Sequence, residues 1–139
     1  MSVTSTGGQD TARIQDHDAI AAVLDLYMEG AAQGDADKLR QAFHPDARMF
    51  GALAGNRYDV PIQALFDLTA EGPADVEGSY RGRVVSVTQV GDAASAVVAE
   101  DGFWGTVSFV DFFNLARVDG RWLIVDKTFA HTGGEMPAH

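Results

Sequence analysis

The sequence predicts an α+β domain in which three N-terminal helices cover one face of a curved antiparallel sheet. In the first half of the 139-residue chain, apolar residues recur at helical spacing, whereas the second half has strand-like alternation and many β-branched and aromatic residues. Its longest such segment, Thr106–Ala130, is divided by Asp119-Gly120, a dipeptide that tolerates the positive φ angles of a tight turn. A hairpin of this length cannot bury its apolar face alone, so the helices must cover it.

The first helix is expected over residues 18–33. Apolar side chains in this segment recur on one helical face, and Tyr27 is among them. Either Asp16 or Asp18 can cap the start of the helix by accepting hydrogen bonds from free backbone amides. Gly34 can supply the left-handed residue that ends it.

Two further helices and the strands follow. Asp35 can cap a second helix over residues 36–43, and Pro61 suits the first turn of a third. Residues 52–59 are expected to form a loop. Strands are expected over residues 46–51, 80–90 and 93–100 and over both arms of the hairpin.

The length fits one domain with a single core, expected over residues 16–132. The segment Met1–Asp10 is rich in Ser, Thr and Gly and lacks the basic and apolar regions of a secretory signal. We therefore expect residues 1–15 to form a mobile tail, and residues 133–139 to form a short polar tail.

The net charge of −10 argues against a nucleic-acid partner, because phosphate binding needs clustered Lys and Arg. No apolar run approaches the roughly 18 residues of a membrane span, so no membrane partner is expected. The chain has no cysteine, which excludes disulfides, thiolate metal sites and cysteine nucleophiles and fits a cytoplasmic protein.

Three segments resemble the nuclear transport factor 2-like (NTF2-like) superfamily, which includes ketosteroid isomerase and SnoaL-like cyclases. They are Tyr27 followed by Gly34-Asp35, the run Phe43–Ala47, and the run Val118–Phe129. Within the superfamily the chain is most similar to the putative lumazine-binding group. The resemblance implies a cone-shaped fold, a deep pocket between the helices and the concave sheet face, and a homodimer through the opposite face.

The resemblance also implies roles for individual residues. Tyr27 has the spacing of an isomerase tyrosine that donates a hydrogen bond to the substrate enolate oxygen, although a core tyrosine is the alternative. Asn114 lies near the second oxyanion donor, although a structural amide is the alternative. Gly51 stands where the isomerase has its catalytic base, and this departure argues against ketosteroid isomerisation. Asp46 on the same strand is an acid-base candidate, although it can simply shape a turn.

Strand parity on the hairpin leaves two arrangements open. Lys127 and His131 share a face with Phe129, so both line the pocket if that face is concave, and each could act as an acid or base. The opposite parity turns Trp122 and its neighbours inward. On the preceding strand we expect Asn114 to lie on the pocket face, whereas the face bearing Phe109, Phe113 and Leu115 is expected to form the dimer surface.

Two other features are weighed. The four histidines, His17, His44, His131 and His139, lack the spacing that places two imidazoles on one side of an element, so we expect no metal site. Trp104 lies in a Gly-flanked turn, where it could close the pocket mouth or extend the dimer interface, although a satellite hydrophobic contact is the alternative.

The sequence therefore predicts a small-molecule-binding protein for an apolar or aromatic ligand, which need not be catalytic and needs no cofactor. The alternative is a cofactor-independent isomerase, dehydratase or cyclase acting on a polycyclic or ketone-type substrate. A third hypothesis is an interaction module that only builds oligomers. The catalytic candidates are Tyr27, Asn114, His131 and Asp46. The ligand-binding candidates are Phe50, Phe66, Trp104, Phe112, Lys127 and Phe129.

Overall fold

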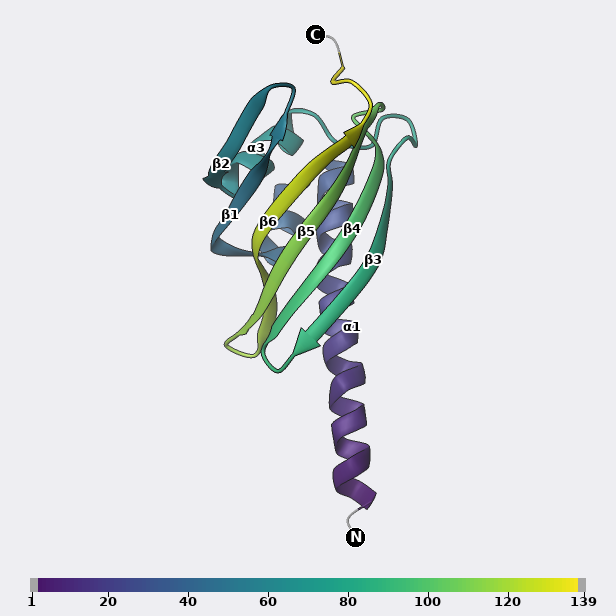
Figure 1. The fold of residues 1–139 in the computed structure, drawn as a ribbon, viewed down its shortest axis with the longest axis vertical. Helices are drawn as coiled ribbons and strands as arrows, with labels where there is room; N and C mark the ends of the chain where they lie inside the picture. The colour runs from purple at the N-terminus through teal and green to yellow at the C-terminus, as the bar shows by residue number, and fades with distance from the viewer. Residues whose placement is uncertain (1–2, 138–139) are drawn as a thin grey trace.

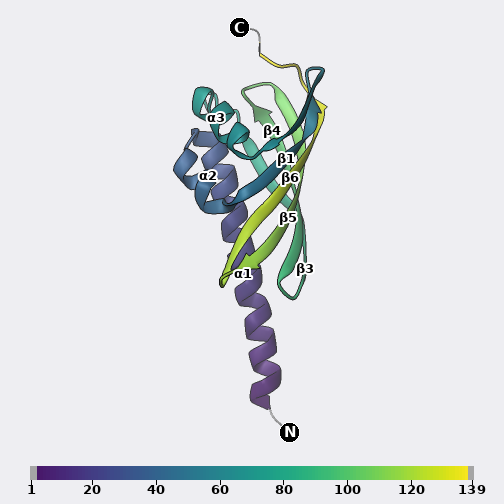
Figure 2. The same ribbon diagram turned by 90° about the vertical axis from the view of Figure 1, so that its left-hand side faces the viewer.

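The computed structural model describes residues 3–137, with side chains from Thr11 onward, and within this range it has three helices and six strands. The elements are α1 (Val3–Gln33), α2 (Ala36–Ala42), β1 (Phe43–Leu53), β2 (Asn56–Pro61), α3 (Gln63–Glu71), β3 (Arg81–Val90), β4 (Ala93–Phe103), β5 (Val107–Val118) and β6 (Arg121–Gly133). All three helices lie against one face of a single curved sheet (Figures 1 and 2), which confirms the predicted fold class. No helix in the described range is both long and apolar enough to cross a membrane.

The helix α1 begins at Val3 and continues through most of the expected N-terminal tail, so its first turns extend past the sheet (Figure 1). The expected cap at Asp16 or Asp18 is therefore wrong, because the helix continues upstream of both. Asp16 instead accepts hydrogen bonds from Arg117 Nη1 at 2.6 Å and Gln89 Nε2 at 2.8 Å, which tie α1 to β5 and β3. The outer ends of the two expected tails, residues 1–2 and 138–139, lie outside the described residues.

The sheet has the strand order β2-β1-β6-β5-β4-β3 and is mixed, because β1 and β6 are parallel whereas the other neighbours are antiparallel. The strand β2 replaces most of the expected loop over residues 52–59. Ala54 and Gly55 have φ angles of 52° and 79° and reverse the chain into a tight hairpin. Because β2 is a short edge strand with exposed charged residues, its apolar alternation is weak.

The strand β5 has the opposite parity to the expected one. Phe109, Phe113 and Leu115 are buried beneath the helices, and the ring of Phe113 packs edge-on against Tyr27 of α1. Phe112 is 49% exposed and Asn114 is also exposed, so both lie on the face away from the helices. Both faces of this strand are largely apolar, and the alternation alone therefore does not show which face packs against the helices.

A bulge explains why neither expected parity of β6 holds along the whole strand. Leu115 pairs with Ile124 and Asn114 pairs with Asp126, so Val125 is an extra residue without a partner in β5. Before the bulge Ile124 is buried, and after it Lys127 and Phe129 are buried. The hairpin turn itself forms as predicted, with φ angles of 50° and 80° at Asp119-Gly120.

Asp35 is the N-cap of α2, as predicted: its side chain accepts hydrogen bonds from the backbone amides of Asp37 at 3.1 Å and Lys38 at 3.2 Å. We expect Asp35→Ala to lower the free energy of unfolding by about 1 kcal/mol, because two helical amides lose their acceptor. Urea denaturation followed by circular dichroism would measure this. Asp35→Ser keeps a capping oxygen and should restore most of the loss. Equal stability of the Ala variant and the wild type would contradict the prediction.

Candidate functional site

An apolar cavity lies between α3, the β1–β2 hairpin and the inner face of β4, β5 and β6. Its volume is about 30 Å³, which is room for roughly two water molecules. Lys127 is the one charged residue among its lining side chains. The lining residues are Met49, Leu53, Tyr58, Leu65, Leu68, Phe103, Trp104, Phe109, Lys127 and Phe129.

Lys127 is only 5% exposed, and its ammonium group is held mainly by charge and by aromatic rings. Its Nζ atom lies 3.8 Å from Asp111 Oδ1, 5.1 Å from the ring centroid of Tyr27 and 5.5 Å from that of Phe129. The 3.8 Å separation is too long for a hydrogen bond. Among the residues that the structure describes, Asp111 Oδ1 has no hydrogen-bond partner, and no acceptor is found for the Lys127 ammonium. A buried donor and a buried acceptor therefore face each other without a bond.

A second carboxyl group, that of Glu100, and two tyrosines adjoin this ion pair in the core. The Tyr27 hydroxyl lies 2.8 Å from Glu100 Oε1 and 2.7 Å from Asp111 Oδ2, and the Tyr80 hydroxyl donates to Glu100 Oε2 at 2.5 Å. Because Tyr27 has one hydroxyl hydrogen, it cannot fully satisfy two ionised carboxylates at once. We call Tyr27, Tyr80, Glu100, Asp111 and Lys127 the buried polar cluster.

Burial raises the pKa of Glu100 well above its ordinary value. The negative charge of Asp111 adds to this rise, whereas Lys127 and Tyr80 oppose it. Burial also raises the pKa of both Tyr27 and Tyr80, so both phenols keep their protons. With Glu100 protonated, the positive charge of Lys127 balances that of Asp111, and the buried polar cluster is neutral.

The catalytic candidates from the sequence do not converge. Tyr27 is fully buried in the core and does not line the cavity, since its hydroxyl contacts the two carboxyl groups. Asn114 is on the outer sheet face, where its amide nitrogen lies 3.2 Å from Asp126 and its oxygen accepts a hydrogen bond from Ser95. The expected approach of Tyr27 to Asn114 is therefore absent, because the two residues lie on opposite sides of the sheet.

The other two catalytic candidates are exposed. Asp46 lies near the start of β1, away from the cavity lining. His131 lies near the end of β6, where Nε2 is 2.8 Å from the carbonyl oxygen of Gly133 and 2.6 Å from that of Gly134. These contacts hold the imidazole against the local backbone and away from the cavity.

Of the six ligand-binding candidates, Trp104, Lys127 and Phe129 line the cavity. Trp104 also donates a hydrogen bond from its indole nitrogen to the carbonyl oxygen of Gly72 at 2.5 Å. The other three candidates lie elsewhere. Phe66 packs against Phe43 in the core, whereas Phe50 and Phe112 lie on the outer sheet face.

Gly51 explains how Phe129 reaches the cavity wall. A Cβ atom at this position would lie 2.6 Å from the Phe129 ring, far inside van der Waals contact. A carboxylate at position 51, where the isomerases have their base, would therefore displace Phe129. Glycine at position 51, which departs from the isomerase pattern, therefore leaves the space that the Phe129 ring occupies.

Sequence reasoning did not select Glu100, Asp111 or Tyr80. A signal was present in the alternation of the strands. Glu100 follows Ala96 and Val98 in the buried parity of β4, and Asp111 shares the parity of its buried aromatic neighbours in β5. A carboxylate at a core position of a strand indicates a buried partner. In the described part of the chain, no group of three or more His, Cys, Asp and Glu side chains is placed to hold a metal ion.

The proton on Glu100 gives a testable pH dependence. In the unfolded chain Glu100 ionises near its ordinary pKa of 4.5, whereas the folded chain retains the proton to higher pH. The unfolded state therefore binds fewer protons above this pH, and the contribution of Glu100 to stability falls as pH rises, by up to about 1.4 kcal/mol per pH unit. Glu100→Gln cannot ionise, so its unfolding free energy should increase relative to that of the wild type as the pH rises above the ordinary pKa of Glu100.

Urea denaturation at several pH values would measure this difference. The exposed Glu71→Gln variant is the control, and its stability should stay parallel to that of the wild type. Parallel curves for Glu100→Gln and the wild type would show that Glu100 is ionised in the folded protein.

Known proteins match most of this chain. A family model described as putative lumazine-binding matches residues 15–130. An NTF2-like protein of unknown function from Shewanella baltica OS155 is 34% identical, with a TM-score of 0.78 and coverage of 87% of this chain and 97% of that chain. Another from Methylobacillus flagellatus KT is also 34% identical, with a TM-score of 0.79 and coverage of 86% and 94%, respectively. Aldolase FrzH from a Cladobotryum species is 26% identical over 116 residues, which cover 82% of this chain and 90% of that protein. The chain belongs to the putative lumazine-binding family and has the NTF2-like fold.

Proposed function

We propose that this protein binds a small, mainly apolar molecule in the cavity beneath α3, with an oxygen atom of the ligand accepting a hydrogen bond from the Lys127 ammonium. The observation behind this proposal is a lysine that is 5% exposed, lines an apolar cavity and has no hydrogen-bond acceptor for its ammonium among the described residues. A ligand oxygen in the cavity would supply this acceptor, and a hydrogen bond from a charged group is among the stronger ones. An apolar wall with one polar contact is typical of small-molecule sites.

The size of the cavity limits which ligands enter without rearrangement. A volume of about 30 Å³ accepts a fragment of a few atoms, so an aromatic ligand must displace lining side chains. Trp104 and Tyr58 are half-buried, and they lie in the β4–β5 turn and on the edge strand β2. We propose that these two side chains move when a larger ligand binds.

A second candidate function is cofactor-independent lyase or isomerase chemistry on a ketone-type substrate. The observation that favours it is the buried polar cluster, in which Asp111 lies beside the lysine and burial raises the pKa of the neighbouring Glu100 carboxyl group. Such a pair can give and take protons in an apolar site. The relative named an aldolase supports this candidate, at 26% identity.

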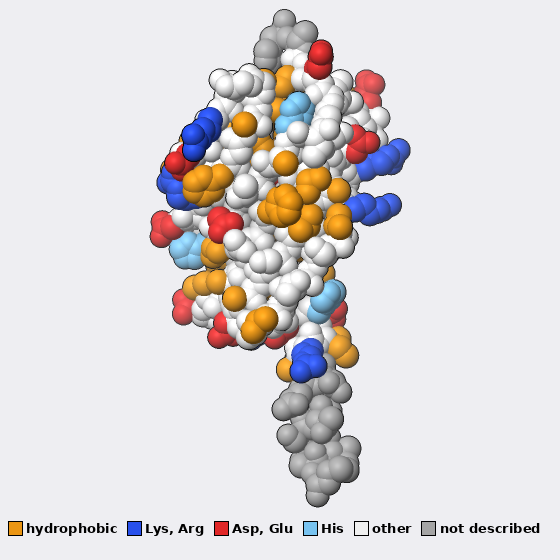
Figure 3. Space-filling model, viewed as in Figure 1, with side chains coloured by type: hydrophobic (Ala, Val, Ile, Leu, Met, Phe, Trp, Pro, Cys, Tyr) orange, Lys and Arg blue, Asp and Glu red, His pale blue; other side chains and the backbone are white. Residues whose placement is uncertain are grey.

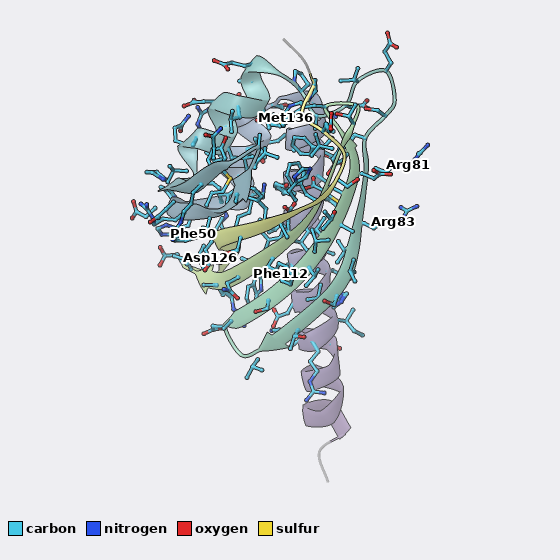
Figure 4. The ribbon with its side chains drawn as sticks, turned by 45° about the horizontal axis from the view of Figure 1, so that its top comes forward. Phe50, Arg81, Arg83, Phe112, Asp126 and Met136 are labelled. Atoms are coloured by element: carbon cyan, nitrogen blue, oxygen red, sulfur yellow. The ribbon has the colours of Figure 1, made fainter. Side chains whose placement is uncertain are left out.

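We further propose that the protein is a homodimer through the sheet face away from the helices. Phe50, Phe112 and Val97 lie in one row across this face, linked by the pairings of β1, β6, β5 and β4, and Val110 lies next to Phe112. We call these four residues the outer apolar patch. Phe50 and Phe112 are 37% and 49% exposed, respectively. Phe50 and Phe112 lie on the same side of the sheet as Asp126 (Figure 4), and apolar side chains gather over the middle of this face (Figure 3). Such patches are common at protein interfaces.

The proposed binding of a small molecule next to Lys127 can be tested with 2-naphthamide, which has an aromatic body and a carbonyl oxygen but does not condense with amines. We expect the wild type to bind it and Lys127→Met/Asp111→Asn to bind about ten- to a hundredfold more weakly, because a hydrogen bond from a charged group is lost. The double substitution leaves no unpaired charge in the core. Isothermal titration calorimetry would measure the affinities.

Lys38→Met removes the other lysine of the chain, which is paired with Glu29 on the surface, and it should bind like the wild type. Absence of binding to the wild type, or equal binding to the folded double variant, would contradict the proposed site.

The homodimer can be tested by light scattering after size-exclusion chromatography. We expect the wild type to have twice the mass of one chain at micromolar concentration, and Phe112→Asp to be a folded monomer, because a charge at the centre of the patch would be buried without a partner. Val90→Asp alters an apolar residue that is 79% exposed at the end of β3, outside the outer apolar patch, and it should remain dimeric. A monomeric wild type would refute the proposal.

A further inference from the structure

We infer that the amine of Lys127 condenses with the carbonyl carbon of an aldehyde or small ketone bound in the cavity, forming a protonated imine, with Asp111 Oδ1 as the proton acceptor. This inference rests on the proposed function, since it names the class of ligand that the same site would take. Three properties of the site support it: the position of Lys127 Nζ, the position of Asp111 Oδ1 as the base, and the positive charge of the imine product.

The nitrogen is placed where a carbonyl carbon can reach it. Lys127 comes from the centre of the sheet, and its side chain lines the cavity even though it is 5% exposed. The carboxylate of Asp111 is the one ionic partner found for it in the described chain, and it lies at 3.8 Å rather than at hydrogen-bonding distance. The nitrogen is therefore not engaged by a strong hydrogen bond that a reacting carbonyl would have to break.

The base is fixed and has a free oxygen. Asp111 is fully buried, and its Oδ2 atom lies 2.7 Å from the Tyr27 hydroxyl, which holds the carboxylate in one orientation. The other oxygen, Oδ1, has no hydrogen-bond partner and is the atom nearest to Lys127 Nζ. A carboxylate oxygen without a partner next to an ammonium group is a ready acceptor for the proton that the amine must lose before it attacks.

The atoms and charges of the step balance within the site. The ammonium transfers one proton to Asp111 Oδ1, and the nitrogen lone pair forms a bond to the carbonyl carbon while the C=O π electrons move to oxygen. That oxygen takes one proton from the nitrogen and one back from Asp111, and it leaves as water as the C=N bond forms. One ammonium and one carbonyl thus give one protonated imine and one water molecule.

The product has the same charge as the free lysine. The positive imine nitrogen remains beside Asp111 and near the rings of Tyr27 and Phe129, so the features that hold the ammonium also hold the product. Because the cavity wall is apolar, the released water is poorly held there and its loss favours condensation. The cavity of about 30 Å³ admits the carbonyl end of a short aldehyde, and the rest of the molecule displaces lining side chains such as Trp104 and Tyr58.

The chain is well suited to a labelling test, because it has two lysines and the second is a natural control. Lys38 is on the surface, where its ammonium lies 3.3 Å from Glu29 and 3.1 Å from Gln33. The full chain would be incubated with propanal and sodium cyanoborohydride, which reduces an imine to a stable secondary amine. Peptide mapping by mass spectrometry would then give the labelling rate of each lysine.

We expect Lys127 to be labelled at least about tenfold faster than Lys38, because the bound aldehyde is held next to the nitrogen. Lys127→Arg keeps the positive charge beside Asp111 and should abolish this labelling in a protein that remains folded. Asp111→Asn should slow it about tenfold or more, as expected for the loss of a proton acceptor. Labelling of Lys127 no faster than Lys38 would overturn the inference, and this measurement needs only the wild type.

The two proposals fail in different ways. If 2-naphthamide binds with the expected dependence on Lys127 but propanal does not label Lys127, the imine is refuted and the binding function stands. If 2-naphthamide binds and also blocks labelling, both events take place in one cavity, which supports both proposals. If neither binding nor labelling is found, both are refuted.

Discussion

The arrangement of this protein depends on the burial of one lysine and two carboxyl groups between a helix and a sheet. Tyr27 projects from α1, Glu100 from β4, Asp111 from β5 and Lys127 from β6, so the buried polar cluster joins four elements through contacts of 2.7, 2.8 and 3.8 Å. These groups stabilise one another in the core, because a buried charge or hydroxyl without a partner is destabilising. The cluster therefore fixes where α1 lies across the sheet.

The cluster also divides the space under the helices into two parts. On one side, Tyr27 packs edge-on against Phe43 and Phe113. On the other side lies the cavity, and Lys127 is the member of the cluster that lines it. A polar network that is buried on one side and open to an apolar cavity on the other can act on a ligand without exposing its charges to solvent. This arrangement gives the lysine both of its proposed roles.

The fold was largely predictable from the sequence, but which side chains of each strand point toward the helices was not. Helical spacing around Tyr27, the Asp35 cap and the Asp119-Gly120 turn depend on short-range patterns, and these local signals were sufficient. Which face of a strand each side chain points to does not depend on short-range patterns alone. Phe112 and Phe113 are both large and apolar although they point to opposite faces, and the bulge at Val125 then reverses the count along β6. Neither fact can be read from alternation in a single sequence.

The same limit explains which part of the site was predicted. Lys127, Phe129 and Trp104 were selected because a lysine and aromatic residues near a predicted concave face are chemically conspicuous. Glu100 and Asp111 were missed because acidic residues are mostly exposed, and alternation places each with apolar neighbours without showing which face of the strand is buried.

The polar groups of this site come from different elements than the resemblance to ketosteroid isomerases implies. There the base belongs to the first strand, but here that position is Gly51, and Phe129 occupies the space that a side chain would need. Glu100, Asp111 and Lys127 lie instead on β4, β5 and β6, and β6 is the strand that pairs directly with β1. The proposed chemistry is therefore centred on an amine with a carboxylate beside it, and not on a lone carboxylate on β1. The NTF2-like scaffold can carry different chemistry on one backbone, because its sites are sets of strand positions whose side chains can change.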